Sequence, residues 1–233
     1  MKLLDPKRGV VLRGLGTSAD CVLAIAFASD GQRLACGGAD NTVHLYSVAT
    51  GKEELRIEQH ADWVMGLAFS PDNRHIASVS RDKSARVFDS QTGELEETYT
   101  GHTQPVFGVA FRPDGQCVIS GGRDKEIHVW QIKDAKKTLS IGGFDSGVIR
   151  FTASGDQLFS CSVDSQVRQH QVLEKKAELV RTFSGHRDVV YALAFHEPTK
   201  RLASGSFDGE VRLWDVATGR LLSTFIAAPG YRR

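Results

Sequence analysis

Serine, histidine and aspartate recur together in this chain in a pattern that could support nucleophilic catalysis. Two sets stand out: Ser204 with His186 and Asp208, and Ser120 with His102 and Asp124. In a catalytic triad the histidine removes the proton of the serine hydroxyl, and the aspartate orients the imidazole ring. The chemistry that such residues could perform is acyl transfer.

The same spacing occurs too often for a single reaction centre. The interval from histidine to aspartate is 22 residues in both sets, and again from His60 to Asp82. Catalysis needs one asymmetric pocket, whereas three equal copies are typical of repeated architecture. We therefore expect no catalytic residue and no enzymatic activity.

Two other patterns do not support a cofactor or metal site. The segment GLGTSA (14–19) resembles a dinucleotide fingerprint, but no helix is predicted after it to hold a phosphate at its N-terminus. The four cysteines form no CxxC pair, so the sequence supports neither a zinc ribbon nor covalent haem attachment. We expect neither a cofactor nor a metal ion.

A repeat of about 42 residues organises the chain. An aspartate recurs at intervals of 42, 42, 40 and 44 residues, at Asp40, Asp82, Asp124, Asp164 and Asp208. Thirteen residues before each aspartate lies a phenylalanine: Phe27, Phe69, Phe111, Phe151 and Phe195. Six residues after each lie Tyr46, Phe88, Trp130, His170 and Trp214. We expect rigid units in which this interval is constant and length changes fall in the links.

Each unit is predicted to contain four short strands. In the third unit, alternating apolar residues in VFGVAF are followed by the turn RPDG, then by CVISGG, a second turn and IHVW. A fourth run, such as LEETYT, precedes each following unit. Short strands joined by Asp and Gly turns indicate an all-β fold, and this repeat length is typical of a β-propeller.

The repeats resemble those of the WD40 family. The stretch GHRDVVYALAFHEPTKRLASGSFDGEVRLWD (185–215) follows the Gly-His to Trp-Asp pattern throughout. The first copy departs from it with Ser18 at the histidine position, and the fourth departs with Gly142 there and His170 at the tryptophan position. The resemblance implies a hydrogen-bonded structural network within the blades, made by His60, Asp82, His102, Ser120, Asp124, Trp130, His186, Ser204, Asp208 and Trp214.

One propeller region is expected over residues 1–233. Because KLLDPKRGVVLRGL aligns with RLWDVATGRLLSTF, we expect the chain to begin inside the third strand of a partial blade. The predicted divisions are a half blade at 1–17, blades at 18–59, 60–101, 102–141, 142–185 and 186–226, and a tail at 227–233. This favours a fragment with an incomplete ring, and the alternative is a closed ring with one thin blade.

Composition indicates a globular domain without a strong electrostatic footprint. The chain is 41% hydrophobic, and its net charge is only +1, so we expect neither nucleic acid nor a membrane as partner. Asp5 and Pro6 stand where a signal peptide needs apolar residues. By default we expect the protein to lie in the cytoplasm. If the chain is a segment of an exported protein, the expected location is the periplasm.

Partner recognition is expected on one rim of the propeller. The resemblance implies that two positions per blade point there, five residues after the histidine and one before the aspartate. The candidates are Met65, Arg81, Phe107, Arg123, Tyr191 and Phe207, together with Trp63, which is expected close by in the link of the second unit. Aromatic residues, Met and Arg dominate interface energetics. The alternative is that Met65, Phe107 and Tyr191 only cap strand ends within their blades.

We expect a non-enzymatic protein-interaction scaffold. Arg81 and Arg123 occupy equivalent places in adjacent blades, which would suit an acidic or phosphorylated peptide. Self-association, or missing blades that complete the ring, is a further expectation. The alternative function is an accessory WD40 domain of a larger enzyme or of a protein that contains c-type cytochrome domains.

Overall fold

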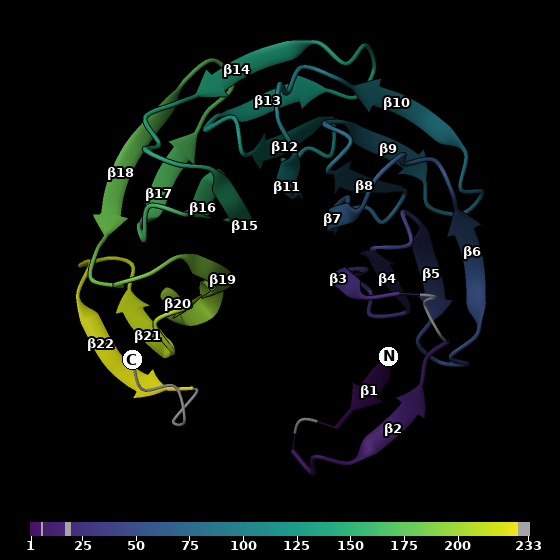
Figure 1. Ribbon diagram of the computed structural model, residues 1–233, viewed down its shortest axis with the longest axis horizontal. Helices are drawn as coiled ribbons and strands as arrows, with labels where there is room; N and C mark the ends of the chain where they lie inside the picture. Colours follow the sequence, from purple (N-terminus) through teal and green to yellow (C-terminus); the bar gives the residue numbers. More distant parts are fainter. Residues whose placement is uncertain (6, 17–19, 228–233) are drawn as a thin grey trace.

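Five antiparallel sheets stand around a central channel (Figure 1). The computed structural model describes residues 1–5, 7–16 and 20–227. Half of GLGTSA, which includes Ser18, and most of the predicted tail lie outside these residues. In every sheet the strands follow chain order, with the first strand nearest the channel and the fourth on the outside. The predicted all-β propeller is confirmed, with five four-stranded blades and a small N-terminal sheet.

The N-terminal sheet pairs β1 (Lys2–Leu4) with β2 (Val11–Gly14). The first blade contains β3 (Val22–Phe27), β4 (Arg33–Gly38), β5 (Val43–Ser47) and β6 (Glu53–Ile57). The second contains β7 (Val64–Phe69), β8 (His75–Ser80), β9 (Ala85–Asp89) and β10 (Leu95–Tyr99). The third contains β11 (Val106–Phe111), β12 (Cys117–Gly122), β13 (Ile127–Gln131) and β14 (Lys137–Ile141).

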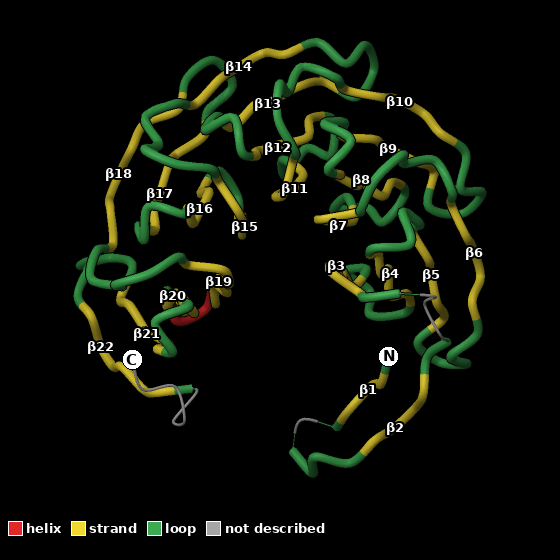
Figure 2. The backbone as a smooth tube through the Cα atoms, viewed as in Figure 1, coloured by secondary structure: helices red, strands yellow, loops and turns green. Residues whose placement is uncertain are grey.

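The fourth blade contains β15 (Val148–Ser154), β16 (Gln157–Ser162), β17 (Val167–Val172) and β18 (Ala177–Phe183). The fifth contains β19 (Val190–His196), β20 (Arg201–Ser206), β21 (Glu210–Asp215) and β22 (Leu221–Ile226). A single 3-10 turn, η1 (Glu197–Thr199), joins β19 to β20 and is the helical segment in Figure 2.

The repeated aspartate forms the tight turn between the second and third strands of each blade. The residue after it has a positive φ in all five blades: Asn41, Lys83, Lys125, Ser165 and Gly209. In four blades the aspartate side chain accepts a hydrogen bond from the backbone N–H two residues later. Aspartate favours such turns because its carboxylate satisfies the backbone locally. The aspartate spacing is thus a turn signal.

Hydrophobic packing between neighbouring blades forms the core. Between the second and third blades, Val79 and Val87 pack with Phe111 and Trp130, and the Trp130 ring is fully buried. The rings of Trp130 and Tyr99 stack with centroids 4.9 Å apart. Equivalent clusters lie between the other neighbouring blades. Each blade therefore supplies one face to the blade before it and the opposite face to the blade after it.

Close packing of the inner strands requires small residues. A Cβ atom on Gly66 of β7 would lie 2.7 Å from the backbone oxygen of Phe107 in β11. Real Cβ atoms do not approach an oxygen that closely, so this position excludes larger side chains. Strand pairing places Ala24, Gly108 and Ala192 at the equivalent positions of three other blades.

The fourth blade corrects the predicted alignment. In the third blade Phe111 pairs with Val118, whereas the equivalent pair in the fourth is Ala153 with Leu158. The turn between β15 and β16 is two residues shorter, so Phe151 does not occupy the repeated phenylalanine position. The prediction that all length changes fall in the links was wrong for this blade.

This shift reassigns two further positions. Val148 is equivalent to Val106, because it begins the same strand and pairs with the same end of its neighbour. Counting from Val148, Phe144 rather than Gly142 stands at the histidine position. By the same count, Ile149 rather than Gly147 is the equivalent of Phe107.

The ring is open in the described part of the chain. Figure 1 shows the fifth blade and the β1–β2 sheet facing one another across a gap. Phe225 of β22 pairs with Val211, as Phe183 of β18 pairs with Val167. Phe183 is 2% exposed and Phe225 is 55% exposed. The difference arises because the fifth blade covers the face of the fourth, while within the described part of the chain no following blade covers the fifth.

These two phenylalanines provide a matched test of packing between blades. We expect Phe183→Ala to lower the free energy of unfolding by about 3–5 kcal/mol, because it empties a filled site. Phe225→Ala should cost less than about 1 kcal/mol, since its ring is already half in solvent. Urea denaturation of both variants checks this. Equal losses would show that the fifth blade is covered in solution.

Candidate partner-binding face

Three of the predicted histidine, serine and aspartate sets form continuous hydrogen-bonded chains. In the third blade, His102 Nδ1 lies 2.7 Å from Asp124 Oδ2, and His102 Nε2 lies 2.9 Å from Ser120 Oγ. Trp130 Nε1 donates to the same Ser120 Oγ at 3.1 Å. His186, Ser204, Asp208 and Trp214 repeat this arrangement in the fifth blade. In the second blade, His60 bonds Asp82 and Ser78.

When the histidine is neutral, each bond of such a chain has a defined donor and acceptor. The tryptophan N–H donates to the serine oxygen, the serine hydroxyl donates to Nε2, and Nδ1–H donates to the aspartate. Burial alone would raise the pKa of Asp208, but hydrogen bonds from the backbone and from His186 outweigh it and lower the pKa to about 2. The Asp208 carboxylate therefore stays charged. Its hydrogen bonds hold the link between the fourth strand of one blade and the first strand of the next.

Burial determines what these serines can do. Ser78, Ser120 and Ser204 are buried, and two of their oxygens already accept a tryptophan N–H. A nucleophilic serine must reach the carbonyl of a substrate. These side chains have no such access, so their arrangement holds strands together.

In the fourth blade an arginine of the third strand, rather than a histidine, pairs with the aspartate. Arg168 Nη1 lies 2.8 Å from Asp164 Oδ2, and its guanidinium lies 4.9 Å from the centre of the Phe144 ring. His170 occupies the tryptophan position, where it is buried and its Nδ1 has no hydrogen-bond partner. The blade thus keeps its aspartate turn with a different partner.

One cluster has the residue types of a metal site. The ligand atoms of His186, Asp208 and Glu210 lie within 4.8 Å of one another. Both nitrogens of His186 are already bonded within the blade, and Glu210 forms ion pairs with Arg187 and Arg212. The existing partners of these groups account for the cluster.

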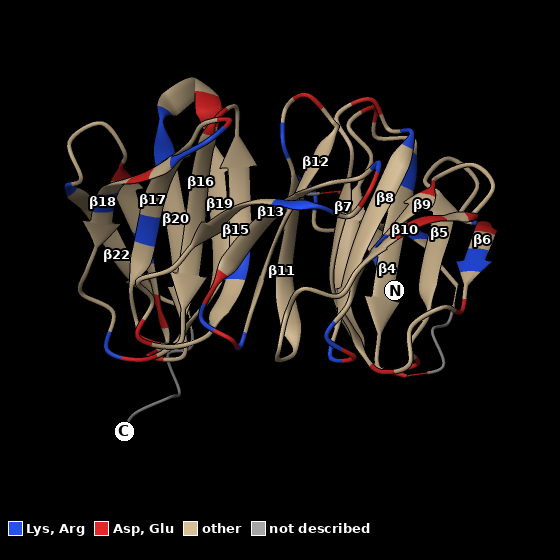
Figure 3. Cartoon of the chain, turned by 90° about the horizontal axis from the view of Figure 1, so that it is seen from above, with Lys and Arg blue, Asp and Glu red and all other residues tan. Residues whose placement is uncertain are grey.

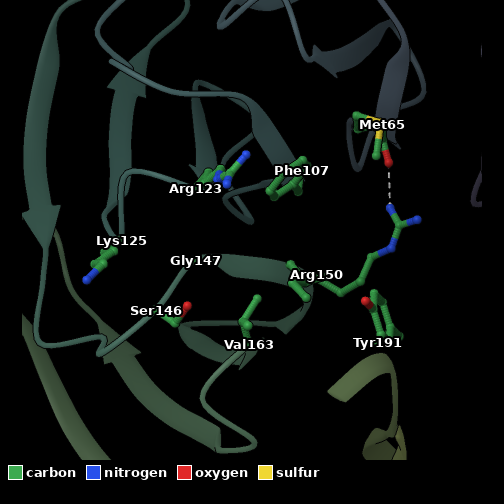
Figure 4. A pocket seen from close by; sticks show the side chains of 10 residues that line it. Met65, Phe107, Arg123, Lys125, Ser146, Gly147, Arg150, Val163 and Tyr191 are labelled. Atoms are coloured by element: carbon green, nitrogen blue, oxygen red, sulfur yellow. Dashed lines mark hydrogen bonds between the residues drawn. The ribbon is translucent and has the colours of Figure 1, made fainter. Parts of the chain in front are cut away.

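A cavity of about 590 Å³ opens among the inner strands on one rim. Four of the seven predicted rim residues line it: Met65, Phe107, Arg123 and Tyr191 (Figure 4). They project from the second residues of β7, β11 and β19 and from the aspartate turn after β12. Strand ends and a tight turn therefore fix the lining.

The other three predicted residues lie outside the lining of this cavity. The Arg81 guanidinium lies 4.4 Å from the centre of the Trp63 ring and pairs with Asp62 at 3.6 Å. Phe207 packs against Tyr191, with ring centroids 5.1 Å apart, beside a smaller cavity on the fifth blade. Arg81 and Arg123 thus have different surroundings, despite their equivalent positions in the repeat.

Sequence reasoning missed Arg150. Strand pairing places it on β15 at the position of Ala24, Gly66, Gly108 and Ala192. Its side chain extends toward Met65, as Figure 4 shows, and its Nη1 donates to the Met65 carbonyl at 2.6 Å. Its Nη2 donates to the Leu23 carbonyl at 2.9 Å. Correct alignment of the fourth repeat would have revealed this large cation at a position occupied by small residues.

Charge is otherwise mixed over the molecule. Figure 3 shows acidic and basic residues interspersed in the loops at both rims, while most strand residues are uncharged.

The part of the chain that the structure describes contains no helix with the length and hydrophobicity needed to cross a bilayer.

Buried His170 should make stability depend on pH. Burial lowers the pKa of its imidazole from 6.5 to about 4, and nearby Arg168 adds to this effect. The unfolded chain therefore binds a proton first as the pH falls below about 6.5. This should reduce the free energy of unfolding by about 2 kcal/mol between pH 7 and pH 5.

The variant His170→Phe tests this, because Phe88 fills the equivalent place in the second blade. We expect a smaller loss of stability between pH 7 and pH 5, measured by urea denaturation. Part of the loss should remain, because burial also lowers the pKa of His128. Exposed His196→Gln is the control. An unchanged pH profile in His170→Phe would contradict a buried neutral imidazole.

Comparison with known proteins agrees with this architecture. The family model "WD domain, G-beta repeat" (WD40) matches residues 9–47, 51–89, 93–131 and 177–215. Eukaryotic translation initiation factor 3 subunit I of Neurospora crassa is 36% identical over 77 residues, which are 33% of this chain and 22% of that protein. Human pre-mRNA-processing factor 17 is 34% identical over 80 residues, which are 34% of this chain and 14% of that protein.

The chain matches less than a quarter of the length of each of these relatives. The matches are therefore evidence about the repeat and not about the activity of a whole protein. The WD40 model, by contrast, matches more than half of the chain, in four places that correspond to the observed periodicity. The chain belongs to the WD40-repeat family.

Proposed function

We propose that the protein is a non-enzymatic scaffold that binds a segment of a partner protein in the cavity on the rim. The supporting observation is that four of the rim residues predicted from the repeat line one cavity of about 590 Å³. The lining combines apolar side chains with cations, which is the composition of energetically important interface sites.

The mechanism of this scaffold is rigid display. Met65, Phe107 and Tyr191 belong to strands that pair on one side and pack against neighbouring blades on the other. A partner segment would meet side chains that are already in place. The protein then contributes little to the entropy cost of ordering the interface.

The relatives support the general class of function. One is named as a subunit of an initiation factor and the other as a processing factor. Such names fit a protein that acts within assemblies. Neither relative is named as a cytochrome, so the expectation of a c-type cytochrome context gains no support from them. An accessory role within a larger protein remains the second proposal, because the matches cover only parts of longer relatives.

Removing apolar surface from the cavity tests the scaffold. We expect the double variant Met65→Ser with Tyr191→Ser to reduce recovery of the bound partner at least tenfold in affinity capture with mass spectrometry. Both side chains are partly exposed, so melting temperature should change little. Leu179→Ser, exposed on the outer strand β18, is the matched control. Equal recovery with both variants would place binding elsewhere and refute the proposal.

A further inference from the structure

Arg150 is a cation without a counter-ion. Both of its terminal nitrogens donate to backbone carbonyls, of Met65 and of Leu23. No ion pair joins it to a carboxylate among the described residues, and the side chain is partly buried in the channel. Burial lowers the pKa of the guanidinium from its usual value, although arginine remains charged at neutral pH. Its uncompensated charge is costly in the free protein.

Two further cations share the cavity. Arg123 and Lys125 line it together with Arg150, and the described residues contribute no aspartate or glutamate to the lining. Both side chains are exposed, and neither forms an ion pair within the described residues. Because the chain as a whole is nearly neutral, this local excess of three positive charges is a property of the cavity. An anion entering it would be attracted by all three.

The remaining lining selects among anions. Met65, Phe107, Ile149, Val163 and Tyr191 surround the cations with largely apolar surface. The free energy needed to remove a phosphate dianion from water is larger than that for a carboxylate. Apolar side chains offset little of it, because they form no hydrogen bonds with the anion. The surroundings favour a carboxylate next to an apolar side chain.

We propose that the cavity binds an acidic peptide segment, in which glutamate or aspartate carboxylates pair with the cations of the lining while a neighbouring apolar side chain packs on Met65 and Tyr191. This inference rests on the proposed scaffold function and specifies the chemistry of its partner. It also revises the pair predicted from sequence, because Arg81 is already paired with Asp62 outside the lining.

A peptide array tests this chemistry directly. Ten-residue peptides are synthesised in three versions that carry glutamate, glutamine or phosphoserine at one central position beside a phenylalanine. We expect glutamate versions to bind the full chain at least tenfold more tightly than their glutamine counterparts. Calorimetry on the strongest peptides should show weaker binding as sodium chloride rises. Equal binding of glutamine versions, or binding of phosphoserine versions alone, would overturn the proposal.

Variants assign the effect to the three cations. The double variant Arg123→Gln with Lys125→Gln should lose at least tenfold in affinity for the glutamate peptides, without loss of stability. Arg150→Met should lose a similar factor, and Arg187→Gln, exposed on the fifth blade outside the lining, should bind normally. If Arg150→Met fails to fold, the double variant decides the matter, because neither Arg123 nor Lys125 forms a side-chain hydrogen bond or ion pair within the described residues.

The two proposals fail in different ways. If glutamine peptides bind as well as glutamate peptides and Met65→Ser with Tyr191→Ser abolishes both, the scaffold function stands and the acidic partner is refuted. If no version binds, the acidic peptide is refuted, and lysate capture with the same serine variants then decides the scaffold function separately.

Discussion

Packing of one blade against the next is the constraint on which the rest of the structure depends. A four-stranded sheet has two faces, and in water both must be covered if they are apolar. Radial stacking achieves this, because each interior blade is covered by one neighbour on either side. The buried Trp130 and Phe183 show the result where a neighbour is present, and exposed Phe225 shows it where none is. Stability is therefore shared between blades, as in other repeat proteins.

The polar network follows from that packing. Stacked blades bury the ends of the strands, and the backbone and side chains there must find partners. The chain from tryptophan through serine and histidine to aspartate satisfies them in two blades, and a shorter version does so in a third. These residues resemble a reaction centre because both tasks need an oriented imidazole. In this fold the same arrangement is buried, so a substrate cannot reach it. It joins the link before the first strand of a blade to the aspartate turn of the same blade.

Sequence predicted the fold because its signals are local. The aspartate turns require a backbone that only certain residues adopt, and they repeat with the blades. Alignment of the fourth blade failed because Phe151 kept the expected distance by coincidence, while the turn after β15 had lost two residues. That error concealed Phe144 and Ile149, and with them the identity of the position held by Arg150. Met65, Phe107, Arg123 and Tyr191 were predicted from the family pattern, which places strand starts and aspartate turns on the same rim. Their convergence on one cavity depends on the radius and twist of the ring, which spacing alone does not encode.

The small residues of the inner strands have a consequence for how this chain can vary. Ala24, Gly66 and Gly108 line a cavity of about 290 Å³ among the inner strands, and Arg150 lines it from the fourth blade. Residues of four blades therefore share one volume. A bulky side chain at any of the three small positions would take up space beside Arg150. Substitutions at four positions that are far apart in the sequence are thereby coupled.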